Sequence, residues 1–151
     1  MDEAPKTIRV LLADDHPIVR AGIRSELEKL PGVQVVAEAS DGRQALELAI
    51  AQKPDVVFMD ISMPNLNGLE AAGRLTKEVP TARVIMLSRH ENEEYYWHAL
   101  RAGASGFLLK KAAVAELGDA VKQVMAGEIY LTKEISNRLK KTAVTRLTRK
   151  T

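Results

Sequence analysis

Five short apolar runs, each followed by a segment with helical periodicity, constrain the fold of this chain more than any other feature. The runs are rich in valine, isoleucine and leucine, and several are continuously apolar. Continuous apolar runs are typical of strands buried on both faces, as in a parallel sheet covered by helices. The expected strands are 8–13, 33–37, 56–59, 84–87 and 106–109.

The segments between the runs repeat apolar residues at helical spacing. One stripe contains Ile23 and Leu27 and follows Pro17, a residue that suits the first turn of a helix. Ser40 or Asp41 can cap the second helix. This (βα)5 pattern predicts an α/β doubly wound, flavodoxin-like three-layer sandwich, whose parallel sheet has the strand order 2-1-3-4-5.

Polar residues stand where four of the five runs end. Asp14 and Asp15 follow the first run, Asp60 the third, Ser88 the fourth and Lys110 the fifth. In the predicted order these strands are neighbours, about 4.8 Å apart, so their polar ends converge at one edge. Three close carboxylates need cations, which Mg2+ and a lysine ammonium supply, and a carboxylate can accept a phosphoryl group. The residues therefore predict a Mg2+-dependent aspartyl-phosphate site.

Each of these residues has a simpler interpretation when it is considered alone. Asp15 can cap the first helix, and Asp60 can cap the turn after its strand. Ser88 is a common strand-end residue, and Lys110 can be a solvated lysine. Only the coincidence of all of them at one edge favours a reactive site.

Composition excludes several other classes of protein. The 151 residues include no cysteine, which excludes disulfides and thiolate metal sites. No apolar run approaches the roughly 20 residues of a membrane span, so we expect a cytoplasmic protein with no membrane partner. The net charge of +2 divides into −4 over residues 1–132 and +6 over residues 133–151. We interpret the basic end as a solvated tail, with nucleic-acid contact as the alternative.

The sequence pattern changes after Gly127, a residue that suits the end of the fifth helix. Ile129 and Leu131 indicate a brief extended piece. Ile135 and Leu139, at spacing i, i+4, predict a short extra C-terminal helix.

Four stretches together resemble a known family: LLADDHPIVRAGI, DVVFMDISMPNLNGLEAA, VIMLS and AGASGFLLKK. They look like the response-regulator receiver (CheY-like) domain of two-component signalling, over residues 7–127. DDHPIVRAGI and LLKK are similar to the NarL/FixJ (LuxR-type) subfamily, whose members carry a C-terminal helix-turn-helix domain. The resemblance implies a receiver over residues 1–128. It implies a linker with a short helix and basic tail over residues 129–151, the start of a missing DNA-binding domain.

The resemblance also implies a metal and a phosphoacceptor. Asp60 would be the phosphoacceptor, and the cofactor would be Mg2+, with Mn2+ as a substitute. Asp15 and Asp60 would bind the metal directly, and Asp14 largely through water. The backbone carbonyl of Ser62 would complete the protein ligands.

Three further residues receive roles from the resemblance. Ser88 would bond the phosphoryl group, Lys110 would pair with it, and Phe107 would be the switch aromatic, which turns inward as Ser88 moves. Some positions depart from the commonest family pattern, among them Lys111 and Arg89. Lys111 stands where many receivers have proline, which leaves open whether the Lys110–Lys111 bond is cis. The bulky Arg89 is expected to narrow access to the phosphoryl site.

The implied partners are those of a signalling switch. A phosphohistidine on a sensor histidine kinase would donate the phosphoryl group, phosphorylation would favour a homodimer, and promoter DNA would be bound only through the missing domain. A stand-alone receiver acting by protein contacts is the alternative. A phosphohydrolase is disfavoured because Ser62 stands where such enzymes commonly carry a second acid. We therefore expect no enzyme beyond self-catalysed phosphoryl transfer and acyl-phosphate hydrolysis.

Overall fold

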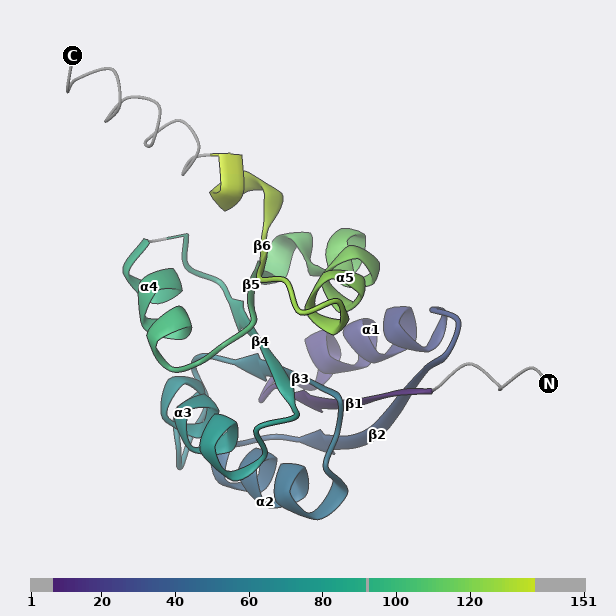
Figure 1. Cartoon of the computed structure of the whole chain (residues 1–151), viewed down its shortest axis with the longest axis vertical. Coiled ribbons are helices and arrows are strands. Elements are labelled where there is room, and N and C mark those ends of the chain that lie inside the picture. The colour runs from purple at the N-terminus through teal and green to yellow at the C-terminus, as the bar shows by residue number, and fades with distance from the viewer. Residues whose placement is uncertain (1–6, 92, 138–151) are drawn as a thin grey trace.

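Six parallel strands form one sheet in the computed structural model, which describes residues 7–91 and 93–137 (Figure 1). Their order across the sheet is β2-β1-β3-β4-β5-β6. The strands are β1 Ile8–Ala13, β2 Val33–Ala39, β3 Val56–Asp60, β4 Arg83–Ser88, β5 Gly106–Leu109 and β6 Tyr130–Leu131. The helices are α1 Pro17–Glu28, α2 Gly42–Gln52, α3 Gly68–Glu78, α4 Glu93–Arg101 and α5 Lys110–Met125. Within the described ranges, no helix has the length and apolar character needed to span a membrane.

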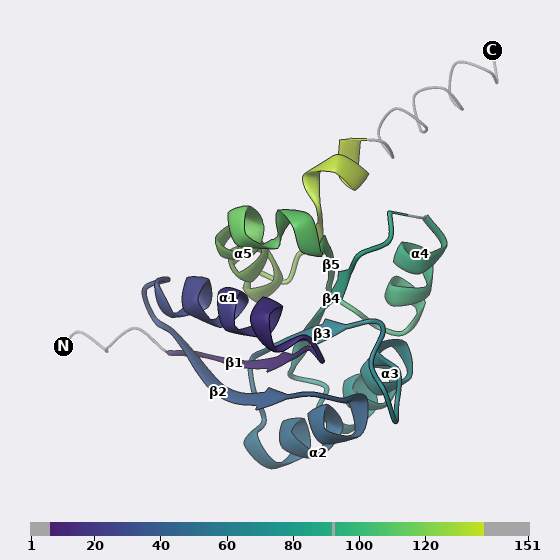
Figure 2. The same ribbon diagram turned by 180° about the vertical axis from the view of Figure 1, so that it is seen from behind.

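Helices cover both faces of the sheet. Figures 1 and 2 show α1 and α5 on one side and α2, α3 and α4 on the other. Successive strand residues point to opposite faces, so Val57 and Met59 of β3 pack in one core while Val56 and Phe58 pack in the other. This double coverage explains why the β3 run is apolar throughout. The predicted three-layer α/β fold and the order of its first five strands are confirmed.

The sheet has one strand more than the sequence pattern predicts. The extended piece after Gly127 joins the sheet as β6, where Tyr130 lies opposite Gly106 and Leu131 opposite Phe107. Two residues are too few for periodicity to identify as a strand. Helical residues follow at 133–137, as expected. Leu139 and most of the predicted basic tail lie outside the described residues.

Local signals set several helix boundaries. Pro17 occupies the first turn of α1. Asp41 caps α2, because its side chain accepts a hydrogen bond of 2.7 Å from the backbone N–H of Gln44. Gly127 has a φ of +84°, as expected for a residue that ends a helix. The interpretation of Asp15 as the cap of α1 is wrong: His16 is the N-cap residue and makes no side-chain capping bond.

Gly68 allows α3 to begin directly against the end of β3. A Cβ atom at this position would lie 1.9 Å from the backbone carbonyl oxygen of Asp60. The backbone N–H of Gly68 donates a hydrogen bond of 2.8 Å to the carbonyl of Ile61. The chain can therefore fold back on itself beside Asp60 only where residue 68 has no side chain.

We expect Gly68→Ala to lower the free energy of unfolding by about 2 kcal/mol or more, because the new methyl group would meet fixed backbone. Gly73→Ala is the matched control, since a Cβ there meets nothing within 4 Å on the same helix. It should be neutral or stabilise by up to about 1 kcal/mol. Urea unfolding followed by circular dichroism measures both. Equal stability of the two variants would contradict the close approach at Gly68.

Candidate functional site

A buried ammonium group joins two buried carboxylates at the carboxyl edge of the sheet. Asp14 follows β1, Asp60 ends β3, and Lys110 begins α5 directly after β5. Nζ of Lys110 lies 2.9 Å from Oδ2 of Asp60 and 3.0 Å from Oδ2 of Asp14. The side chain of Lys110 is 8% exposed, and those of Asp14 and Asp60 are 0% and 4% exposed. The structure thus brings these three predicted residues into one ion-paired cluster.

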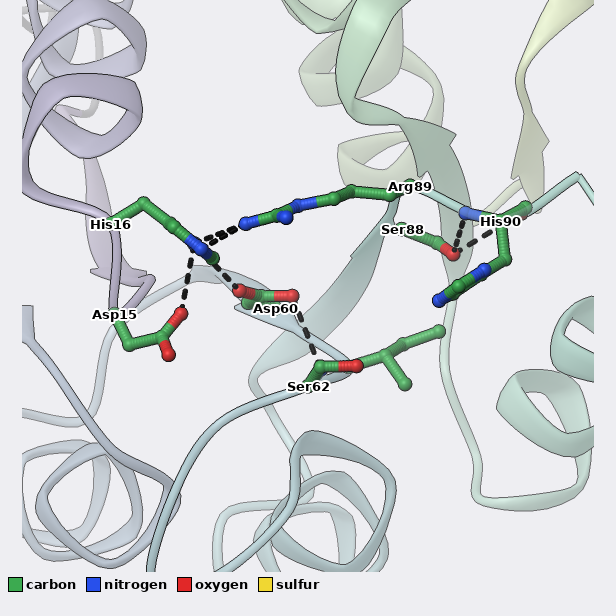
Figure 3. Close-up of a pocket in the computed structure, with 8 residues that line it drawn as sticks. Asp15, His16, Asp60, Ser62, Ser88, Arg89 and His90 are labelled. Carbon is green, nitrogen blue, oxygen red and sulfur yellow. Dashed lines mark hydrogen bonds and ion pairs between the residues drawn. The ribbon is translucent and has the colours of Figure 1, made fainter.

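The other predicted polar residues line a cavity over this cluster. Its volume is about 320 Å³, and Figure 3 shows Asp60 near its centre. The backbone N–H of Ser62 donates a hydrogen bond of 3.2 Å to Oδ1 of Asp60. Asp60 therefore accepts a hydrogen bond from the turn after its strand, as the capping interpretation requires. Its other carboxylate oxygen faces Lys110. The cavity is lined by Asp15, His16, Asp60, Ile61, Ser62, Ser88, Arg89 and His90.

Burial makes Asp60 an unusually weak acid. Loss of solvent raises the pKa of Asp60 from 3.8 to about 6, although the hydrogen bond and charge of Lys110 lower it. The charge of Asp14 acts in the same direction as burial. Each positive charge added to the cavity would therefore stabilise the ionised form of Asp60.

The acidic residues fit a divalent cation. Asp14, Asp15, His16 and Asp60 each offer a ligand atom, and these atoms lie within 4.8 Å of one another. Oδ2 of Asp14 and Oδ1 of Asp15 are buried and make no hydrogen bond, although each lies near a basic nitrogen. Carboxylate oxygens are the ligands that Mg2+ and Mn2+ prefer. The donor set is thus compatible with the predicted cofactor.

Ser88 directs its hydroxyl group to its own loop. Oγ of Ser88 accepts a hydrogen bond of 2.9 Å from the backbone N–H of His90 and donates one of 3.2 Å to the carbonyl of the same residue. The ring of His90 stacks on Tyr95 of α4, with centroids 4.7 Å apart. Ser88 therefore links the end of β4 to the start of α4, and its hydroxyl does not bond Asp60.

Phe107 lies behind the cavity in the apolar core. Its side chain is fully buried and meets Tyr96 edge-on, with centroids 6.4 Å apart. The ring is thus already inward in this structure. The Lys110–Lys111 bond, whose geometry the sequence left open, is trans.

Two residues that line the cavity, His16 and Arg89, make contacts that the sequence did not predict. Nδ1 of His16 lies 2.9 Å from Asp15 and 3.1 Å from Asp14. The guanidinium of Arg89 extends across the cavity and contacts the ring of His16 (Figure 3). Arg89 was expected from its bulk to narrow access to the phosphoryl site, but its contact with His16 was not expected. The position of His16 directly after two acids was the available signal that it enters the site.

Comparison with known families matches the part of the chain that carries these site residues. Residues 10–122 match the response regulator receiver domain family. This chain belongs to that family. A receiver is a signalling domain of two-component systems. The match ends within α5, before β6 begins.

Relatives of this receiver are response regulators of the NarL/LuxR type. The chain is 40% identical to the transcriptional regulatory protein DegU of Brevibacillus brevis over 132 residues, which is 87% of this chain and 56% of DegU. It spans 56 to 62% of the length of several curated relatives that it matches.

Solved structures agree with the fold of this receiver. A LuxR-family response regulator from Aurantimonas sp. SI85-9A1 superposes with a TM-score of 0.86 at 36% identity, covering 92% of this chain and 99% of that one. The isolated receiver of RcsB from Salmonella enterica serovar Typhimurium, solved with phosphomimetic BeF3-, has a TM-score of 0.79 at 29% identity, covering 87% and 98%.

The raised pKa of Asp60 predicts a stability change in the metal-free receiver. A folded-state pKa of about 6 against 3.8 means that the folded state holds the proton more tightly. Folding therefore loses stability as the pH rises from about 4 to 6, and the loss persists at pH 7. Asp60→Asn removes the ionisable group, so it should raise the free energy of unfolding at pH 7 by about 1–3 kcal/mol.

The higher free energy of unfolding expected for Asp60→Asn should disappear below about pH 4, where the carboxyl group of the wild type is protonated in both the folded and the unfolded state. Urea unfolding of chelator-treated protein at several pH values measures it. Asp119→Asn, at an exposed position of α5, is the control and should change little. A destabilised Asp60→Asn at pH 7 would contradict the burial cost that we assign to this carboxylate.

Proposed function

We propose that Asp60 accepts a phosphoryl group from a phosphohistidine of a sensor histidine kinase, in a reaction that depends on Mg2+ or, as a substitute, Mn2+. The observation that carries this proposal is the position of Lys110, whose buried ammonium contacts Asp60 and Asp14 together. A buried lysine in this position can hold a phosphoryl oxygen beside the new bond between Asp60 and phosphorus. Membership of the receiver family supports the same reaction.

The transfer requires few changes in the protein. A carboxylate oxygen of Asp60 forms a bond to phosphorus while the phosphorus–nitrogen bond of the donor breaks, and the leaving imidazole keeps the electron pair and takes up a proton. Lys110 would then pair with a phosphoryl oxygen. A metal ion held by Asp15, Asp60 and the backbone carbonyl of Ser62, with Asp14 largely through water, would supply further positive charge.

The switch would begin at Ser88. Its hydroxyl now bonds the backbone of His90, and a phosphoryl group on Asp60 would offer it a charged acceptor instead. A move of Ser88 would release the start of α4, and the packing of Tyr96 against Phe107 would adjust with it. The phosphorylated form would therefore favour a different surface around α4 and β5.

We propose that residues 1–128 form the receiver, followed by a linker over residues 129–151. The whole protein would respond to phosphorylation by forming a homodimer and binding promoter DNA through a separate helix-turn-helix domain. The name of DegU as a transcriptional regulatory protein supports this output. We expect the protein to act in the cytoplasm, where it would meet its target DNA. A stand-alone receiver that acts by protein contacts is the alternative.

Asp60→Asn should abolish Mg2+-dependent labelling by acetyl phosphate, because the amide cannot form an acyl phosphate. Phosphate-affinity electrophoresis measures the phosphorylated fraction. Asp119→Asn on α5 is the matched control and should be labelled like the wild type. Undiminished labelling of Asp60→Asn, or labelling unaffected by chelation of Mg2+, would contradict the proposal.

Arg89 should limit the entry of donors and water. Its side chain reaches from the end of β4 to His16 and covers part of the cavity (Figure 3). We expect Arg89→Ala to speed both labelling by acetyl phosphate and decay of the acyl phosphate by roughly three- to tenfold. Arg101→Ala, on an exposed face of α4, is the control. A slower reaction in Arg89→Ala would instead mark Arg89 as a contact of the phosphoryl group.

A further inference from the structure

The strand β6 lies outside the family match but pairs with the part of β5 that leads to the site. The backbone N–H of Tyr130 donates to the carbonyl of Ser105, and that of Thr132 donates to the carbonyl of Phe107, each at 2.9 Å. Gly106 lies at the contact: a Cβ atom there would be 3.1 Å from the carbonyl oxygen of Tyr130. β6 is therefore closely fitted to the backbone on both sides of Phe107.

Thr132 continues this pairing with its side chain. The residue is fully buried, and its Oγ1 accepts a hydrogen bond of 3.0 Å from the backbone N–H of Leu109. A regular parallel ladder would give this N–H a carbonyl of the next strand. Since β6 ends at Leu131, the hydroxyl of Thr132 replaces that carbonyl. Without it, the N–H of Leu109 would be buried with no partner.

The bonded N–H belongs to the residue before Lys110. Leu109 ends β5 and is the N-cap residue of α5, so its backbone sets the direction in which the Lys110 side chain leaves the sheet. The Lys110 ammonium then reaches Asp60 at 2.9 Å and Asp14 at 3.0 Å. Only one peptide unit separates the Thr132 hydrogen bond from the residue that carries the ammonium.

Glu116 of α5 holds the segment on both sides of Thr132. Its carboxyl group is buried, and Oε1 accepts from the hydroxyl of Tyr130 and from the backbone N–H of Lys133. Burial and the bond to Glu116 raise the pKa of Tyr130, so its hydroxyl remains a donor at neutral pH. Ile135, which is 2% exposed, packs into the same core as Tyr96 and Phe107.

We propose that Thr132 is a positioning residue for Lys110, and that the segment from Tyr130 to Ile135 completes the phosphoryl site. This inference rests on the proposed function, since it assigns Lys110 a phosphoryl contact. The functional receiver would then extend to at least residue 132, beyond the boundary proposed at residue 128. Loss of the Thr132 hydroxyl would loosen the strand–helix junction and shift the Lys110 ammonium relative to Asp60.

Thr132→Val tests the proposal because it keeps the shape of the side chain and removes the hydroxyl. We expect the rate of labelling by acetyl phosphate with Mg2+, measured per folded molecule, to fall about tenfold. Thr132→Ser should restore most of the rate. Thr76→Val is the matched control: it removes a hydroxyl that bonds backbone carbonyls of Gly73 and Ala102, away from the site, and should label like the wild type.

A direct measurement of Lys110 separates positioning from stability. In 15N-labelled protein without donor or metal, Thr132→Val should shift the ammonium signal of Lys110 and speed exchange of the Leu109 amide. Thr132→Ser should restore both. An unchanged ammonium signal together with wild-type labelling would overturn the proposal, even if Thr132→Val were less stable. If acetyl phosphate did not phosphorylate the wild-type protein, the proposed function would be refuted. The ammonium signal of Lys110 would still decide whether Thr132 positions that residue.

If Thr132→Val does not fold, Tyr130→Phe tests whether the segment from Tyr130 to Ile135 positions Lys110. This variant keeps the ring and removes the bond to Glu116. A fall in the labelling rate of about twofold or more, with a shifted Lys110 signal, supports the proposal. A wild-type rate and signal would overturn it.

Discussion

The ion-paired cluster of Lys110, Asp14 and Asp60 is the interaction on which the rest of the site depends. Removing charges from water is costly, and such a cluster persists only where each charge has close partners. Here the ammonium lies about equally far from both carboxylates. The raised pKa of Asp60 shows that one ammonium does not fully offset burial beside Asp14. A divalent cation, if bound at this cluster, would supply the positive charge that is still lacking.

The fold was largely predictable because each signal had a single physical cause. Burial on both faces makes a run such as 56–59 apolar throughout, and parallel strands must place Asp14, Asp60 and Lys110 at one edge. The structure brings these residues together as expected, although their chemical roles stay predictions. Asp15 shows the limit of interpreting one residue alone, since the cap of α1 that its position suggests is not observed.

The parts that could not be predicted depend on contacts between segments distant in sequence. Arg89 meets His16 only after β4 and β1 are placed in the sheet, and side-chain length alone does not give the direction of the guanidinium. β6 has two residues, too few for a periodic signal. Thr132 is an unremarkable residue in the sequence, and its importance comes from one N–H that the short strand leaves without a carbonyl.

The position of β6 bears on how a receiver can communicate with the chain that follows it. A segment joined to the sheet only through its backbone would transmit little about the site. Here the same segment bonds the carbonyl of Phe107 and the amide of Leu109, and it packs Ile135 against the core that contains Phe107. Any shift of β5 that accompanies phosphorylation would therefore move residues 130–135 directly. The path from Asp60 to the following chain would then run through Lys110, Leu109 and Thr132, in addition to the α4 surface.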